Sequence, residues 1–209
     1  IAILDAIQNN REYEKYIRLY IKKYSSYKQN FSPYFNSAFS PGLIKWAETK
    51  TQGFSCGNGA LMRISPIGYM FNTEEEIIQN ARLATIPSHN SNEAITSATT
   101  VALMIHYFRK GLNKDEIYKK LNIEIKYSPF KKFNTTCYET LGNCFYALYN
   151  SKSFSEAIKL TLFMGGDTDT NCAIVGSIAE AMYGINPLLK SKAEAKLPEE
   201  FIYVLKKIK

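Results

Sequence analysis

The segment richest in side chains that could do chemistry spans residues 165–170 and reads Gly-Gly-Asp-Thr-Asp-Thr. Carboxylates two residues apart, followed by a threonine hydroxyl, can share a hard cation such as Mg²⁺, and the glycines give the backbone freedom to turn there. Asp and Thr are also favoured as ordinary caps in the first turn of a helix. Spacing alone therefore leaves two interpretations of Asp167, Asp169 and Thr170, a metal site on a partly exposed loop or a helix cap.

A second candidate is the glycine-rich stretch of residues 55–63, Ser-Cys-Gly-Asn-Gly-Ala-Leu-Met-Arg. Such a loop can bring backbone N–H groups close to phosphate oxygens. The Asn-Gly dipeptide is also a common tight turn, so the motif is weak when taken alone.

The chain has two histidines in different settings. His89 follows Pro87 and Ser88 on a polar connection, where its imidazole could bind a base or a phosphate or could be a hydrogen-bonded structural residue. His106 lies beside Ile105 and Tyr107 in an apolar run, and we assign it to packing.

Helical spacing dominates the rest of the chain. Apolar residues over 4–24 predict one opening helix, and the segment from Asn171 to Gly184 predicts a central, buried helix rich in small residues. Gly176 within that helix costs stability, so we expect close helix packing to require it. No period-two strand is evident, which indicates an all-α bundle of about eight to ten helices. Three predicted helix starts carry the capping-box pattern, at Thr73 with Glu76, Asn113 with Glu116 and Ser153 with Glu156.

Bulk properties restrict the class of protein. The 209 residues, 45% hydrophobic and 22% charged, suit one globular domain, and no apolar run is long enough to cross a membrane. The net charge of +7 comes from scattered lysines, which argues against nucleic-acid binding and favours an anionic ligand. Four dispersed cysteines suggest a reducing cytoplasm. Because Ile1 already lies within an amphipathic pattern, we expect residues 1–209 to form a single domain truncated at its N-terminus.

Taken in order, three stretches resemble the ADP-ribosylglycohydrolase family. They are residues 57–68, the Ser88-His89 step, and residues 165–170 with the small-residue segment that follows to Gly184. The resemblance implies a compact orthogonal multi-helix bundle that holds two Mg²⁺ ions and cleaves ADP-ribose from an acceptor.

Residue by residue, the resemblance implies Asp167, Asp169 and Thr170 as metal ligands. It also implies an ADP-ribose pocket lined by Ser55, Gly57, Asn58, Gly59 and His89, with Arg63 as a structural anchor. No residue of this chain matches a general acid or base.

The family also carries an early Gly-Asp motif and a Thr-Asp-Asp-Thr motif, and neither occurs in this sequence. One pair of carboxylates is too few to hold two divalent ions. We therefore expect the intact protein to be a Mg²⁺-dependent hydrolase of ADP-ribosylated proteins or small ADP-ribose conjugates. The alternative is an inactive member of the fold that binds ADP-ribose or has a structural role.

Overall fold

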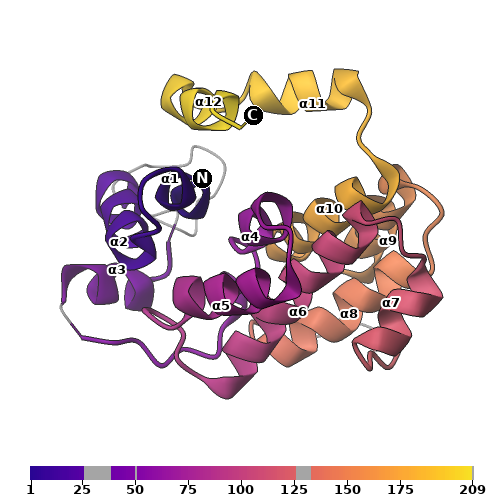
Figure 1. Ribbon diagram of the computed structural model, residues 1–209, viewed down its shortest axis with the longest axis horizontal. Helices are drawn as coiled ribbons and strands as arrows, with labels where there is room; N and C mark the ends of the chain where they lie inside the picture. Colours follow the sequence, from indigo (N-terminus) through magenta and orange to yellow (C-terminus); the bar gives the residue numbers. More distant parts are fainter. Residues whose placement is uncertain (26–38, 50, 126–132, 209) are drawn as a thin grey trace.

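The chain folds into packed α-helices, as Figure 1 shows for a computed structural model that describes residues 1–25, 39–49, 51–125 and 133–208. The described residues form twelve α-helices and one short 3₁₀ turn, with two isolated β-bridges and no strand. The all-α prediction is confirmed, with more helices than expected. The elements are α1 (Ala2–Gln8), α2 (Tyr13–Tyr24), α3 (Pro41–Glu48), η1 (Asn58–Ala60), α4 (Ser65–Met70), α5 (Glu74–Thr85), α6 (Asn92–Arg109), α7 (Lys114–Lys120), α8 (Cys137–Tyr149), α9 (Phe154–Met164), α10 (Thr168–Tyr183), α11 (Pro187–Glu194) and α12 (Glu199–Lys206).

The single opening helix predicted from the sequence is in fact two. Asn10 and Arg11 adopt left-handed backbone conformations, with φ of 63° and 60°, and this reverses the chain between α1 and α2. Residues other than glycine seldom adopt positive φ, although asparagine does so more readily than most. The apolar spacing survives the break because α1 and α2 pack against each other.

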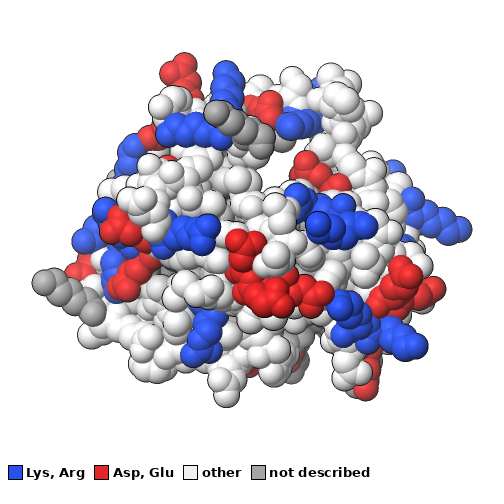
Figure 2. Space-filling model, viewed as in Figure 1, with Lys and Arg blue, Asp and Glu red and all other residues white. Residues whose placement is uncertain are grey.

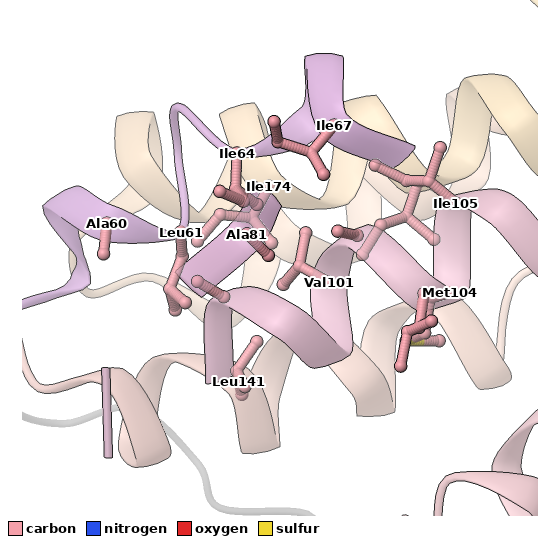
Figure 3. Close-up of a cluster of buried hydrophobic side chains, with 14 of the residues drawn as sticks. Ala60, Leu61, Ile64, Ile67, Ala81, Val101, Met104, Ile105, Leu141 and Ile174 are labelled. Carbon is pink, nitrogen blue, oxygen red and sulfur yellow. The ribbon is translucent and has the colours of Figure 1, made fainter. Parts of the chain in front are cut away.

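Helix α6 forms the centre of the fold and packs against α4, α5, α8 and α10. Figure 3 shows the apolar side chains that fill this region, with Val101 and Ile105 from α6 facing Ile67 of α4 and Ile174 of α10. All four side chains are fully buried. Helix α10 lies in this core and also packs on α8 and α9, so the prediction that it is central is confirmed.

The close approach between helices involves a different glycine from the one expected. A Cβ atom on Gly68 of α4 would lie 2.5 Å from the Ala102 carbonyl oxygen and 2.7 Å from Cβ of Ile105. A Cβ on Gly176 would instead meet Ile158 at 3.6 Å, an ordinary van der Waals contact. The expectation that packing requires Gly176 is therefore wrong, and Gly68 sets the distance between α4 and α6.

The last two helices leave the main body and return to the beginning of the chain (Figure 1). Helix α12 packs on α1, where Gln8 Nε2 donates to the Val204 carbonyl oxygen at 3.1 Å. The Phe201 ring meets the edge of Tyr24 at 5.1 Å between centroids, and Lys23 pairs with Glu200. These contacts hold the two ends of the described chain together.

Charged side chains of both signs are interspersed on the face drawn in Figure 2, with no continuous basic field. One of the ion pairs joins Lys120 and Glu74 at 3.1 Å. Among the described residues, no helix has the length and apolar character needed to span a bilayer. All four cysteines are free thiols.

Candidate functional site

The acidic pair lies where α9 ends and α10 begins. Gly165 and Gly166 have φ of 76° and 80°, a left-handed conformation that glycine adopts without strain, and they turn the chain between the two helices. The sequence predicted that helix α10 begins at Asn171, but it begins at Thr168. Asp169 therefore belongs to its first turn. Asp167 occupies the N-cap position, yet its side chain makes no capping hydrogen bond. Simple helix capping therefore does not account for the Asp167 carboxylate.

The Asp167 carboxylate is instead held by the glycine-rich loop. Asn58 Nδ2 donates to Asp167 Oδ2 at 2.8 Å and to Thr140 Oγ1 of α8 at 3.1 Å. Asn58 is 5% exposed and Asp167 6% exposed, so the contact is shielded from water. Asp167 is therefore buried rather than on a partly exposed loop, whereas Asp169 is exposed as predicted. Thr140 is a site residue that no sequence motif indicated.

Burial raises the pKa of the Asp167 carboxyl above its usual value, and the neighbouring Asp169 carboxylate raises it further. The hydrogen bonds from Asn58 and Thr170 act in the opposite direction. A buried carboxylate whose charge is disfavoured by a neighbouring carboxylate is an arrangement that a divalent cation stabilises.

The donor set fits part of a Mg²⁺ site. Asp167 and Asp169 supply carboxylate oxygens, and Thr170 supplies a hydroxyl within the same turn, all of which are ligands suited to a hard cation. Within residues 1–25, 39–49, 51–125 and 133–208, no group of three or more His, Cys, Asp or Glu side chains is placed to hold a metal. The described residues thus fit one cation in part and do not supply the carboxylates that two ions require.

The loop that carries Asn58 is fixed on the side of α8 by backbone hydrogen bonds. Asn58 N donates to the Thr135 carbonyl oxygen at 2.7 Å, and Cys137 N donates to that of Cys56 at 3.0 Å. Gly57 N donates to Ser55 Oγ at 3.1 Å, so this hydroxyl shapes the turn while Ser55 itself stays exposed. The loop is therefore a rigid edge between α8 and α10.

His89 closes the other side of the loop. Its side chain is 4% exposed, and a Cβ atom on Gly59 would lie 3.4 Å from His89 Nε2. A short antiparallel bridge between Phe54 and His89 holds the backbones together, and Gly53 allows the close approach because a Cβ there would lie 2.4 Å from the Ser88 carbonyl oxygen. The structure thus brings the predicted loop residues and His89 together.

Burial and the nearby Arg63 guanidinium lower the pKa of His89 to about 3. Below pH 6.5 the unfolded chain takes up a proton at this residue and the folded chain does not, so folding stability falls as the pH falls. We expect His89 to lower the free energy of unfolding by about 2 kcal/mol between pH 6.5 and pH 5. Urea unfolding of wild type and of His89→Gln at both values checks this, because His106 titrates in both proteins. An equal pH dependence in the two proteins contradicts it.

Comparison with known proteins identifies the fold and the family. A solved structure described as an ADP-ribosylglycohydrolase-related protein complex superposes with a TM-score of 0.64 at 21% identity, over 93% of this chain and 76% of that one. That likeness establishes the fold. The sequence also matches the ADP-ribosylglycohydrolase family over residues 5–205, and the chain therefore belongs to this family.

Curated relatives are distant in sequence. An ADP-ribosylarginine hydrolase, Tri1, from Pseudomonas putida is 23% identical over 152 residues, which are 63% of this chain and 40% of that protein. An ADP-ribosyl-[dinitrogen reductase] glycohydrolase from Rhodospirillum rubrum is 24% identical over 159 residues, covering 69% and 53% respectively. The chain thus spans about half the length of the curated relatives it matches.

Proposed function

We propose that this protein is a Mg²⁺-dependent hydrolase that releases ADP-ribose from an ADP-ribosylated protein side chain or a small ADP-ribose conjugate. The observation that carries the proposal is the hydrogen bond from Asn58 to Asp167, which joins two motifs 109 residues apart into one site. Family membership supports the same chemistry, and the relatives named above are hydrolases of ADP-ribosylated substrates.

Each part of the site has a separate task in this proposal. Asp167, Asp169 and Thr170 would hold Mg²⁺, which when bound supplies Lewis acidity and orients ligand oxygens. Ser55, Gly57 and Gly59 form the rigid edge on which the ADP-ribosyl group lies, and Asn58 keeps the Asp167 carboxylate beside that edge.

His89 would contact the ligand from the far side of the same edge. Holding the ligand against fixed groups supplies the orientation that lowers the barrier. We assign two Mg²⁺ ions to the working enzyme, and the second requires carboxylates beyond the Asp167 and Asp169 pair. A cytoplasmic location suits four free thiols.

The incomplete set of metal ligands favours one second candidate, a protein that binds ADP-ribose without hydrolysing it. Purified full-length protein incubated with an ADP-ribosylarginine peptide, an ADP-ribosylserine peptide or O-acetyl-ADP-ribose separates the two. We expect free ADP-ribose to appear from at least one substrate with Mg²⁺ and not with EDTA. Binding of ADP-ribose without release from any substrate supports the binding protein. If the protein shows no binding of ADP-ribose and no release, both candidate functions are refuted.

A further inference from the structure

A directed chain of hydrogen bonds runs from Arg63 to His89. Arg63 Nη2 lies 2.6 Å from Ser88 Oγ, and Ser88 Oγ lies 2.8 Å from His89 Nδ1. A guanidinium group carries only N–H donors, so Ser88 Oγ must accept from Arg63. The single hydroxyl hydrogen of Ser88 is then free to point at His89.

The same geometry favours one tautomer of His89. Arg63 Nη2 also lies 3.4 Å from Nδ1, and it too can only donate. An N–H on Nδ1 would face this donor, so the geometry favours Nδ1 as the acceptor nitrogen of the ring, with the Ser88 hydroxyl donating to it. A neutral imidazole has one N–H, which therefore lies on Nε2.

The Nε2–H group faces the glycine-rich loop. In the part of the chain that the structure describes, no side chain or backbone group hydrogen-bonds to His89 Nε2. A Cβ on Gly59 would lie 3.4 Å from it, so this edge of the ring lies against Gly59. The donor therefore points toward the loop on which the ADP-ribosyl group is proposed to lie.

The positive charge of Arg63, beside His89, is not neutralised by a carboxylate among the described residues. Burial lowers the pKa of Arg63 to about 10, and no carboxylate pairs with Arg63 among the described residues. Its Nε atom is buried and has no hydrogen-bond partner. A positive group of this kind favours an anion nearby and opposes protonation of the adjacent imidazole.

We propose that Arg63 and Ser88 are positioning residues that hold His89 as the neutral Nε2–H tautomer, a fixed donor beside Gly59 for an anionic oxygen of the ligand. The identity of the ligand as an ADP-ribosyl group rests on the proposed function, whereas the tautomer does not. In this arrangement His89 binds and orients the ligand and does not exchange protons with it.

The tautomer can be measured directly by NMR of the full-length protein labelled with ¹⁵N-histidine. The ring of His89 is expected to show the neutral Nε2–H pattern throughout pH 5.5–8. Arg63→Met removes the N–H groups that face Ser88 Oγ and His89 Nδ1, and this variant should show a mixture of tautomers. Arg63→Lys keeps a positive donor and should restore the single form. Arg82→Met, at an exposed position, is the matched control and should change nothing. A wild-type Nδ1–H tautomer, or a ring that titrates in this range, overturns the proposal whether or not the variants fold.

Titration with ADP-ribose tests the ligand. Wild type should bind with a change in the ¹⁵N shift of His89 Nε2, and His89→Leu should bind about 10- to 100-fold more weakly. His89→Gln, which retains an N–H donor, should recover much of that loss. Equal affinity of His89→Leu and wild type overturns this inference and leaves the proposed function standing. Failure of wild type to bind ADP-ribose refutes the proposed function and the assigned ligand, while the tautomer is judged by the first experiment.

Discussion

Replacing both Asp167 and Asp169 with asparagine is expected to reduce release of ADP-ribose by the full-length protein by at least about 1,000-fold, with folding preserved. The amides keep the shape of the carboxylates but lose the charge that a divalent cation requires. Folding should survive because the raised pKa of Asp167 shows that its charge is unfavourable in the folded chain. An asparagine oxygen at position 167 can still accept the hydrogen bond from Asn58.

The measurement is the rate of ADP-ribose release together with the melting temperature. Asp115→Asn is the matched control, because Asp115 is an exposed residue that accepts from the Tyr149 hydroxyl at 2.7 Å, and an amide can do the same. The control should retain wild-type activity. Undiminished turnover in the double variant contradicts the metal-binding role of the pair, and a large fall in its melting temperature contradicts the expected tolerance of the fold.

Gly68→Ala is expected to destabilise the fold by about 2 kcal/mol or more, which corresponds to roughly 4–8 °C in melting temperature for a chain of this size. The new methyl group would lie 2.5 Å from the Ala102 carbonyl oxygen and 2.7 Å from Cβ of Ile105. Neither atom belongs to the end of a flexible side chain, so α4 must move away from α6. That shift opens the contact between the two helices.

Gly142→Ala is the control for this prediction. Gly142 lies within α8, and a Cβ there would meet no atom within 4 Å. Alanine is favoured over glycine in a helix interior, so this variant should be more stable by about 1 kcal/mol. Thermal unfolding of both variants checks the contrast, and similar melting temperatures for the two would show that the α4 and α6 contact tolerates expansion.

Local rules predicted much of the helical framework. Thr73, Asn113 and Ser153 each accept a hydrogen bond from the backbone N–H three residues later, so all three predicted helix starts are confirmed. The reciprocal contact of a full capping box forms only at Asn113, where Glu116 accepts from the Asn113 N–H. At Ser153, Glu156 accepts instead from the N–H of Lys152. Sequence identifies the cap, but the glutamate rotamer depends on its surroundings.

What the sequence did not reveal depends on long-range packing. The reversal at Asn10 and Arg11 falls in a polar stretch that the helical spacing of Ile7 and Ile17 spans, and the helix contact at Gly68 concerns a neighbour in another helix. The site has the same character. Motifs and family resemblance selected Asn58 and Asp167, but no spacing rule predicts that they bond to each other or that Thr140 shares the contact.

The central claim is that the glycine-rich loop, His89 and the Asp167 and Asp169 pair form one site for an ADP-ribosyl ligand and a divalent cation. A crystal structure of the full-length protein with ADP-ribose and Mn²⁺ in place of Mg²⁺ tests it most directly, because Mn²⁺ is located by its anomalous scattering. We predict an anomalous peak bound by Asp167 and Asp169, with the ligand against Gly57 and Gly59 and within hydrogen-bond reach of His89 Nε2. A cation bound away from both carboxylates, or ADP-ribose bound away from this loop, would contradict the claim.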